Sequence, residues 1–548
     1  MSHPCCMLYN ETPIFILINI LTNRRWPMQK FITRFSDLIK GALNGFDRIV
    51  FKGLILPLMS PSGVASFCRS RKILNKDYKQ WMMEQTSDIV KNAEQYSKQH
   101  CGKGIEYLSS WNIRKEAAAH NRQKLEGLDK GLIGIWSCLE TGSSYRAVYS
   151  EKSGYPQLRN YQTRCKHLYF YFDDADLGFM NIRLQTWFPY HIQVCLNGRE
   201  WLRRSLEKRG IVFEAKGNKF LHIEDYQQAQ RLLDEQLDTR FTAILNGFLP
   251  TVFPMMQNVL GSHLSYYWTL WQSEWATDLI FESPKRLNPL MDSLLRHAHI
   301  IGTSSRVLRY LDRPLTKADK PYAHSKDDVI TRVSEFNDGL RLRHWAGKNS
   351  VKVYNEQNVL RIETTMNDPG KFKIYRNKQG QPSDTAKKLL PLRKGVMDIP
   401  MRATISQHVN NRFSDDLATL HDKSQVGDVI KEINHHIMRN GRRFRALDPT
   451  GKDLELLQAI SDPAYSISGL TNKMVRQTLV NSSFGKGQTD KQLSAKISRY
   501  LKLLRIHGII RKVPNQNRYL ITVKGARLVN LINSFLAAST EDLLKIAA

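Results

Sequence analysis

The 548-residue sequence predicts a multidomain α+β protein: an N-terminal α/β region, a helical segment, a β-meander and a C-terminal domain of helices with a hairpin. Three observations support this class. The chain is too long for one ordinary hydrophobic core, so we expect two to four domains. Strand-like and helix-like runs alternate through the first half of the chain, and the C-terminal part combines helical spacing with a hairpin pattern. Hydrophobic residues make up 41% of the chain, as expected for a folded protein.

The predicted parts follow periodicity along the chain. From residue 167 the runs HLYFYF, GFMNIRLQTWF and HIQVCL predict strands, and the helical pattern GREWLRRSLEKRG follows directly. We expect the aromatic run YYWTLWQSEWATDLIF to be helical, and the alternating segments of 340–376 to form the meander. Met28 opens a helical pattern that we expect to extend to residue 43. The expected boundaries are 1–27 for an N-terminal extension, 28–250 for the α/β domain, 251–330 for an aromatic-rich helical segment, 331–376 for the β-meander, 377–401 for a linker, and 402–548 for a helical connector with the terminal domain.

The charge balance favours a polyanionic partner. There are 81 Lys and Arg residues against 51 Asp and Glu, a formal net charge of +30. A field of this size attracts nucleic acid, so we expect DNA as the main partner and RNA as the second class. The longest apolar run, IFILINIL, is too short to span a bilayer. Seven scattered cysteines without a CxxC pair argue against structural zinc and suit a reducing cytoplasm. A homodimer is compatible with the sequence, which does not determine the oligomeric state.

The C-terminal region has the most specific pattern. Apolar residues from Leu493 to Leu504 follow helical spacing, with cationic residues on the opposite face, and His507-Gly508 ends the predicted helix. Two short strand patterns, IIRKV and RYLITV, then flank the polar turn PNQN, and two more helices are expected upstream at 453–461 and 468–480.

This arrangement resembles the winged helix-turn-helix superfamily. The resemblance implies a third helix in the DNA major groove and a hairpin along the backbone or minor groove. Between residues 481 and 530 there are 11 Lys and Arg residues and one acid, Asp490. The alternative is a protein-contact module. The expected nucleic-acid contacts are Lys491, Ser494, Lys496, Ser498, Arg499, Lys502, Arg511, Lys512, Asn515, Asn517 and Arg518.

From about Met28 to the end, the chain also resembles a family of bacterial proteins that carry a MarR-like label for their C-terminal winged helix. The resemblance rests on GFDRIVFKGLILPL, RLQTWFPYHIQVCLNGREWL, SEWATD and NSVKVYNEQNVLRIETTMNDP. It supports the domain layout and implies no particular reaction.

Four carboxylates are candidates for catalysis: Asp47, Glu274, Asp278 and Glu363. We expect Asp47 to open a strand after a helix, where nucleases of the ribonuclease-H type place their first carboxylate. Glu274 and Asp278 are four residues apart and would share one face of a helix. Converging carboxylates could hold Mg²⁺ for attack on a phosphodiester, with Asp47 and Glu274 as the expected metal ligands. The alternative is that these carboxylates pair with Arg48 or Arg361.

A second candidate surface combines aromatic and basic residues. Arg183, Gln185 and Trp187 would share one face of a strand, and Arg199 and Arg203 follow on a helix. Such a surface could stack and hydrogen-bond nucleotides. Trp187 in an ordinary hydrophobic core is the alternative.

Two shorter motifs have competing interpretations. His191 and Gln193 resemble the metal-binding strand of some rolling-circle replication initiators, with Tyr226 as the nearest candidate nucleophile. A histidine in the core is the simpler interpretation. The segment 352–368 resembles part of phage and plasmid replication proteins. Its alternative is a hairpin in which Lys352 and Glu363 form a cross-strand pair.

The sequence therefore favours a sequence-directed DNA-binding protein of mobile-element or replication type that processes nucleic acid with Mg²⁺, in the cytoplasm and associated with the nucleoid. One alternative is a non-enzymatic transcription regulator whose front senses a ligand or dimerises. Another is an RNA-binding protein. Clustered acids around a cleft would favour the enzyme, and a large apolar pocket without carboxylates would favour the sensor.

Overall fold

The computed structural model describes most of the chain. The expected N-terminal extension and Asn515 lie outside the described residues. The described residues form two compact units, one drawn from the ranges 1–296, 332–343 and 348–415, the other from 297–331, 344–347 and 416–548. The described residues are 29–109, 114–128, 130–311, 329–337, 339–377, 388–418, 426–460, 470–513, 517–522, 524–525, 528–529 and 531–532.

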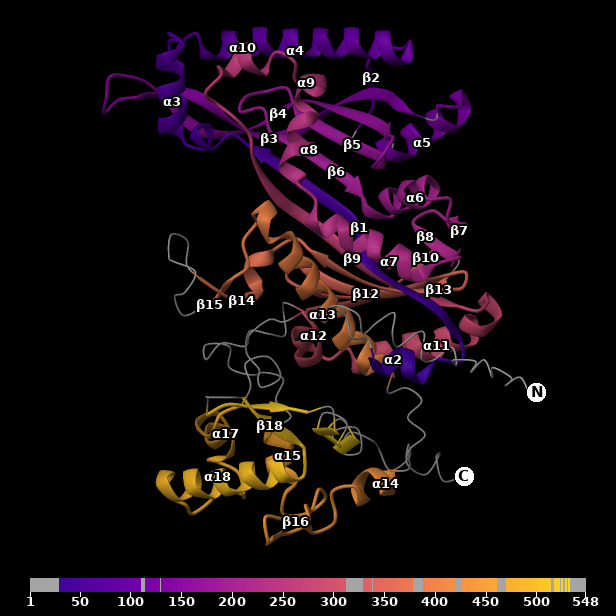
Figure 1. Ribbon diagram of the computed structural model, residues 1–548. Helices are drawn as coiled ribbons and strands as arrows, with labels where there is room; N and C mark the ends of the chain where they lie inside the picture. The colour runs from indigo at the N-terminus through magenta and orange to yellow at the C-terminus, as the bar shows by residue number, and fades with distance from the viewer. Residues whose placement is uncertain are drawn as a thin grey trace, which may run out of the picture. The chain divides into compact units, whose positions relative to one another are not determined.

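The expected mixed α+β class is confirmed. Among the described residues, the main sheet has 11 strands in the order β10-β11-β12-β13-β9-β1-β6-β5-β4-β3-β2. The long strand β1 crosses the sheet beside β9 (Figure 1). The pairs β13–β9, β9–β1, β1–β6, β6–β5 and β5–β4 are all antiparallel. The strands are β1 Ile39–Leu54, β2 Glu106–Tyr107, β3 Gly131–Ser150, β4 Tyr155–Asp174, β5 Gly178–Gln185, β6 Ile192–Asn197, β9 Tyr267–Phe281, β10 Val329–Phe336, β11 Gly339–Ala346, β12 Asn349–Glu356 and β13 Val359–Met366.

The main hydrophobic core lies between this sheet and several helices. Phe46, Phe51 and Trp275 from the central strands pack with buried residues of α3, α4, α8, α9 and α10, and with Ile399 of α13. The helices outside the C-terminal domain are α2 Gln29–Arg34, α3 Pro61–Ser70, α4 Tyr78–Cys101, α5 Lys115–Glu126, α6 Gly198–Lys208, α7 Tyr226–Glu235, α8 Phe241–Gly247, α9 Leu249–Val252, α10 Met256–Leu260, α11 Pro284–Ile301, α12 Ser304–Tyr310 and α13 Ile399–Leu417. Two small hairpins, β7 Phe213–Lys216 with β8 Lys219–Ile223 and β14 Lys373–Arg376 with β15 Lys388–Pro391, complete this part of the chain.

The first part of β1 is held by its contacts with α7. Gly41 and Gly45 lie so close to Tyr226 and Leu233 that a Cβ would come within 2.5 Å and 2.8 Å of their side chains. Between these glycines, the side chain of Gln230 bonds to the backbone N–H and C=O of Asn44, at 2.8 Å and 3.0 Å. Because Gln230 replaces a neighbouring strand there, this edge of β1 keeps its backbone hydrogen bonds.

Two sequence predictions in this unit were wrong. The helix expected to extend to residue 43 ends at Arg34, and β1 begins at Ile39. The aromatic run expected to be helical is strand β9, which is buried for most of its length and paired on both sides. Bulky aromatic residues favour strands, and β9 pairs with β1 on one side and with β13 on the other.

The C-terminal part has its own core. Leu493, Ile497, Leu501 and Leu504 are buried on α18, as their spacing predicts. Thr489 and Gln492 form a reciprocal capping box at the start of this helix. A single β-bridge joins Leu470 to Tyr519. The elements are α14 Val426–Lys431, β16 Ile437–Arg439, β17 Arg442–Phe444, α15 Leu454–Ile460, α17 Asn472–Leu479, α18 Asp490–Ile506, β18 Ile510–Lys512 and β19 Tyr519–Ile521.

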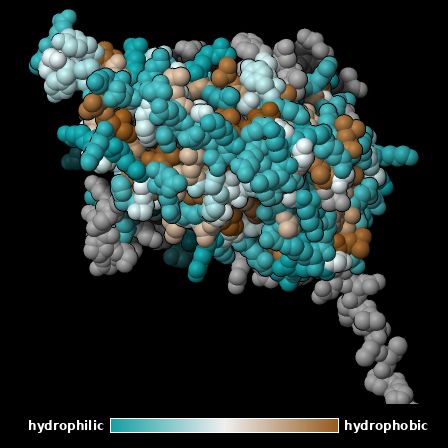
Figure 2. Space-filling view, turned by 90° about the horizontal axis from the view of Figure 1, so that it is seen from above, coloured by the Kyte–Doolittle hydropathy of each residue, from teal (hydrophilic) through white to brown (hydrophobic). Residues whose placement is uncertain are grey.

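The surface drawn in Figure 2 is mostly hydrophilic, with hydrophobic residues in scattered groups. Within the described part of the chain, no helix combines the length and the apolar character needed to cross a bilayer.

Candidate functional site

Three of the four predicted catalytic carboxylates converge. Asp47, Glu274 and Glu363 each offer an oxygen, and these ligand atoms lie within 4.8 Å of one another. They come from neighbouring strands β1, β9 and β13. Strand register explains the convergence, because Arg48 is paired with Glu274, and Glu363 with Ala276, two residues along β9. Alternate residues of a strand share a face, so Glu274 and Glu363 point to the same side of the sheet.

A β-bulge brings Asp47 to this side. The pairing between β1 and β9 shifts between Phe46 and Arg48, which leaves Asp47 as the extra residue. A bulge can direct two consecutive side chains to the same side. Asp47 and Arg48 accordingly line the same small cavity. Asp47 therefore lies within β1 and does not open a strand, which corrects the comparison with ribonuclease-H-type nucleases.

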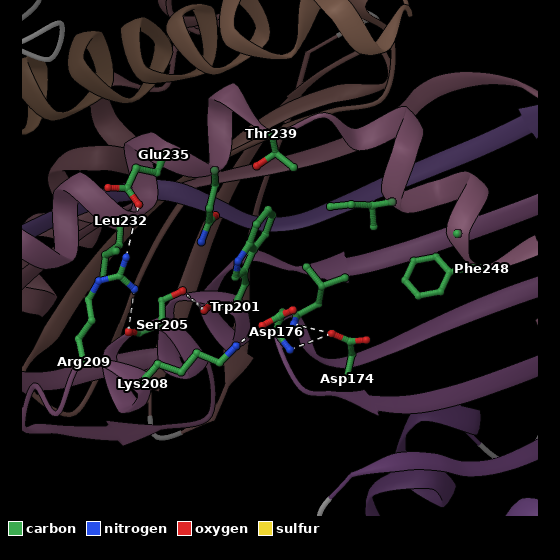
Figure 3. Close-up of a pocket in the computed structure, with 14 residues that line it drawn as sticks. Asp174, Asp176, Trp201, Ser205, Lys208, Arg209, Leu232, Glu235, Thr239 and Phe248 are labelled. Carbon is green, nitrogen blue, oxygen red and sulfur yellow. Dashed lines mark hydrogen bonds and ion pairs between the residues drawn. The ribbon is translucent and has the colours of Figure 1, made fainter.

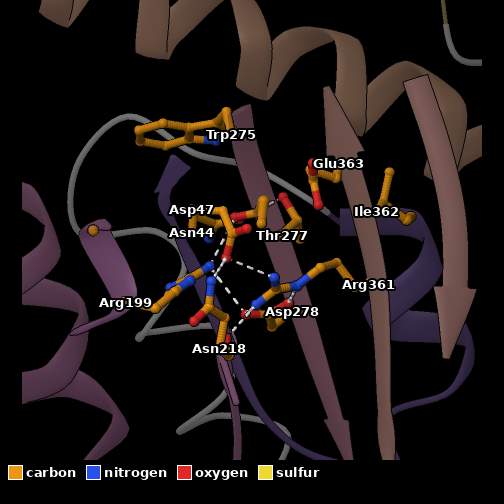
Figure 4. A network of polar contacts seen from close by, with 12 residues as sticks. Asn44, Asp47, Arg199, Asn218, Trp275, Thr277, Asp278, Arg361, Ile362 and Glu363 are labelled. Atoms are coloured by element: carbon orange, nitrogen blue, oxygen red, sulfur yellow. Dashed lines mark hydrogen bonds and ion pairs between the residues drawn. The ribbon is translucent and has the colours of Figure 1, made fainter. Parts of the chain in front are cut away.

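The fourth carboxylate, Asp278, has a different partner set. Arg361 donates to both of its oxygens, at 2.5 Å and 2.8 Å, and also to Asp47 Oδ1 at 2.7 Å. Arg199 of α6 forms a second ion pair with Asp278 at 3.0 Å. Figure 4 shows both arginines reaching Asp278. The helical placement of Glu274 and Asp278 was wrong, because both lie on strand β9, and the catalytic role of Asp278 stays a prediction. The alternative, pairing with Arg361, is confirmed for Asp47 and Asp278.

Burial and nearby cations act on the carboxyl groups in opposite directions. Burial alone would raise the pKa of Asp47, but Arg361 and Arg199 hold that pKa below its ordinary value. Burial raises the pKa of Glu363 to about 7, against the opposing effect of Lys352. Lys352 Nζ lies 2.6 Å from Glu363 Oε1, and the Tyr354 hydroxyl donates to Oε2 at 3.1 Å. The predicted cross-strand pair of Lys352 and Glu363 is thus confirmed.

The carboxylate cluster borders a small opening. A cavity of about 120 Å³ is lined by Asp47, Arg48 and Glu274 together with Glu116 and residues of β5 and β6. Asn218 donates a long hydrogen bond to Asp47 Oδ1 at 3.4 Å. A cation or a few water molecules could therefore reach Asp47 and Glu274 from this side.

The predicted aromatic and basic surface around residues 183–203 is largely internal. Gln185 is buried and donates to backbone carbonyls. Trp187 packs against the main core, which confirms its alternative interpretation. Arg199 is 1% exposed, and Arg203 donates to the Gly217 carbonyl. Arg183 and Arg203 keep partly exposed side chains, and Arg183 pairs with Glu140 at 3.2 Å. The prediction that Gln185 and Arg199 bind nucleic acid was wrong, because burial leaves them no access to a ligand.

His191 also belongs to the interior. It is buried next to β6, and burial lowers its pKa to about 3. The interpretation as a core histidine is confirmed. Tyr226, the candidate nucleophile, packs against Gly41 of β1.

Most of the predicted C-terminal contact residues are exposed, but Ser494, Lys496 and Ser498 also hydrogen-bond within this part of the chain, and Ser498 Oγ accepts from Asn472 Nδ2 at 2.8 Å. Ser494 donates to the Asn472 side chain at 3.1 Å, and Lys496 donates to the Phe484 carbonyl at 2.8 Å while lying over its ring. Arg518 is half-buried. The exposed predicted residues are Lys491, Ser498, Arg499, Lys502, Arg511, Lys512 and Asn517.

A larger cavity, of about 660 Å³, lies beside α6 and α7 (Figure 3). Trp201 and Phe248 provide its aromatic lining, and Lys208 forms an ion pair with Asp176 at its edge. Asp174 and Glu235 also line it. This mixed lining differs from the carboxylate-free apolar pocket that a ligand-sensing regulator would favour.

Comparisons with protein-family models, with curated proteins and with solved structures found no match.

Sequence reasoning missed several residues at the centre of these sites. Arg199 was assigned to a nucleic-acid surface, although it is one of two buried arginines on Asp278. Trp271, with Lys52 and Lys394 over its ring, was not singled out at all. The only sequence signal for Trp271 was its place in an aromatic run that could be interpreted as a helix.

Proposed function

We propose that this chain is a sequence-directed DNA-binding protein whose C-terminal part is a winged helix-turn-helix. The order of elements supports the proposal: helix α15, the bridge at Leu470, helices α17 and α18, then the hairpin β18–β19. The bridge from Leu470 to Tyr519 adds a short third strand beside the hairpin. In this arrangement α18 is the helix that would enter the major groove.

The observation that carries the proposal is the cationic surface of α18 and its hairpin. Lys491, Arg499 and Lys502 are exposed along α18, and Arg511 and Lys512 are exposed on β18. The acid of this region, Asp490, pairs with Arg476 at 3.0 Å. A surface with many cations and few free carboxylates attracts phosphates and releases counterions when DNA binds.

Selection from a randomised duplex library tests sequence-directed binding. We expect the full chain to enrich a defined site. Arg499→Ala should weaken binding and relax the preference at one position, because arginine can read a base edge. Lys491→Ala should weaken binding equally on all sequences, because it would contact phosphate. Lys79→Ala, an exposed lysine of the α3–α4 region, is the matched control. An unenriched library, or binding that neither α18 variant changes, would favour a protein-contact module.

A second candidate function rests on the convergence of Asp47, Glu274 and Glu363. We propose that these three carboxylates hold a divalent cation such as Mg²⁺, which prefers carboxylate oxygens. When bound, such an ion can orient a phosphodiester and activate water. Arg361 and Lys352 would balance the remaining negative charge of the cluster and hold Asp47 and Glu363 in place. A protein of mobile-element or replication type would combine such chemistry with site recognition by α18.

Incubation with the selected DNA, single- or double-stranded, with Mg²⁺ or EDTA, tests this second function on a denaturing gel. We expect discrete products that require Mg²⁺ and that disappear in Asp47→Asn and Glu274→Gln. Glu235→Gln, at the separate cavity beside α7, is the matched control. Intact DNA in every lane, together with unchanged native-gel shifts, would leave a DNA-binding protein without nuclease activity.

A further inference from the structure

An exposed tryptophan with two lysines over its ring lies on the main sheet. Trp271 of β9 is 43% exposed, although it occupies a strand that is otherwise mostly buried. Lys52 Nζ of β1 lies 4.9 Å from the centroid of its ring, and Lys394 Nζ lies 4.7 Å from it. We call Trp271, Lys52, Lys394, Gln193 and Arg183 the Trp271 platform.

Strand register places Lys52, Gln193 and Arg183 in one row. Lys52 is paired with Gln193, and Gln193 is paired with Arg183. Side chains of directly paired residues share a face of the sheet, so these three neighbours point the same way. Arg48, four residues before Lys52, is on the same face and is paired with Glu274. The platform therefore shares a sheet face with the carboxylate cluster, about 13 Å away along β1.

The positive charge of the platform is only partly balanced. Arg183 has Glu140 as an ion-pair partner. Within the described ranges, neither Lys52 nor Lys394 has a carboxylate within ion-pair distance, and both lie over the Trp271 ring instead. Burial, followed by repulsion from Arg183 and Lys394, lowers the pKa of Lys52. An anion at this position would relieve that repulsion.

We propose that the Trp271 platform binds single-stranded nucleic acid. A base stacks on the Trp271 ring, and the ammonium groups of Lys52 and Lys394 move from the ring to the flanking phosphates. An exposed aromatic ring beside cations is the combination that binds single strands without reading their sequence. Gln193 and Arg183 extend the surface along the row. This inference does not depend on duplex binding by α18, because it rests on different residues and a different nucleic-acid form.

Fluorescence anisotropy with labelled dT₂₀ and U₂₀ tests the proposal in the full chain. An Arg499→Ala/Lys502→Ala background reduces the contribution of α18. In that background, we expect Trp271→Ala to weaken binding about tenfold and Trp271→Phe to weaken it much less, because phenylalanine still stacks. Lys52→Ala and Lys394→Ala should each lower the slope of log K against log salt by about 0.7. A difference between dT₂₀ and U₂₀ would identify DNA or RNA as the preferred strand.

Controls separate the platform from general effects on folding. Tyr149→Ala removes another exposed aromatic residue of the same sheet, 63% exposed on β3, and should not change binding. Lys394→Glu reverses a charge at an exposed position and provides a second test if Trp271→Ala lowers the melting temperature. The proposal would be overturned if the Trp271→Ala, Lys52→Ala and Lys394→Glu variants each bound dT₂₀ and U₂₀ with the same affinity as the parent background.

Discussion

Arg361 is the residue on which the buried charges of the sheet depend. It is 1% exposed and donates to Asp47, to both oxygens of Asp278 and to the Asn218 carbonyl. Removing one partner of a buried ion pair leaves an uncompensated charge, which typically costs about 3–5 kcal/mol. We therefore expect Arg361→Ala to lower the free energy of unfolding by about that amount in urea denaturation.

Arg361→Lys separates the charge of this residue from its geometry. Lysine keeps the positive charge but cannot donate to both oxygens of Asp278 in a planar fork. We expect a smaller loss of stability than in Arg361→Ala. Equal losses in the two variants would mean that the fork matters more than the charge, and no loss in either would contradict the role given to Arg361.

Glu363 makes the free energy of unfolding depend on pH. Its pKa is raised from 4.5 to about 7, so between these pH values the folded chain holds a proton that the unfolded chain has lost. Stability due to this group is therefore greatest below about pH 4.5 and falls as the pH rises to 7, by an amount of order 1–3 kcal/mol. We expect wild type to lose stability relative to Glu363→Gln between pH 5 and pH 7.5 in parallel urea titrations. Parallel curves for the two proteins would show that Glu363 does not titrate in this range.

Helix α6 packs closely against strand β1 at Gly198. A Cβ on Gly198 would lie 2.2 Å from the backbone oxygen of Phe46, next to the bulge at Asp47. We expect Gly198→Ala to destabilise the fold by about 1–3 kcal/mol, because the strand and the helix must move apart. Gly247→Ala is the matched control, since a Cβ there meets no atom within 4 Å. Thermal melts of both variants measure the difference, and equal melting temperatures would contradict the close contact.

The start of α18 is fixed by its capping box. Gln492 Oε1 accepts from the Thr489 backbone N–H at 2.9 Å, and the Thr489 hydroxyl accepts from the Gln492 N–H at 3.4 Å. Replacing such a cap by alanine costs about 1 kcal/mol. We expect Thr489→Ala to show this loss in urea denaturation, and Gln477→Ala, exposed within α17, to show almost none. A loss of the same size in both variants would mean that the cap contributes nothing specific.

Sequence patterns predicted some elements well and others wrongly, for physical reasons. The apolar spacing from Leu493 to Leu504 was sufficient for α18, because a short helical domain buries one clear face. The aromatic run of β9 gave no such signal. It is paired on both sides and buried on both faces for most of its length, so alternation is lost. The early start of β1 depends on Gln230, far along the chain, and local pattern cannot show that contact.

The candidate site was predictable only in part. The carboxylates were identifiable as residue types, and Asp47, Glu274 and Glu363 do converge. Asp278 could not be told from them, because its role is set by Arg199 and Arg361 from distant segments. Gln185 and Arg199 are likewise buried, so they cannot belong to the predicted nucleic-acid surface. Spatial partners, which sequence spacing does not reveal, decide which charged residues are available to a ligand.

At the scale of the whole molecule, the proposals assign distinct tasks to different parts of one chain. In these proposals the C-terminal helices and hairpin would select duplex DNA, and the sheet would offer a carboxylate cluster and the Trp271 platform on one face. A pure regulator would need only the first of these. The +30 net charge of the chain fits repeated contact with polyanions and is spread over both parts.

A salt series of duplex binding by the full chain tests DNA recognition by α18, with wild type compared against Lys491→Ala/Arg499→Ala/Lys502→Ala. Each lost phosphate contact should lower the slope of log K against log salt by about 0.9. We expect weaker binding in the triple variant and a slope smaller by about 2, from the phosphate contacts of Lys491 and Lys502, with an unchanged melting temperature. The same affinity and the same slope in both proteins would contradict DNA recognition by α18.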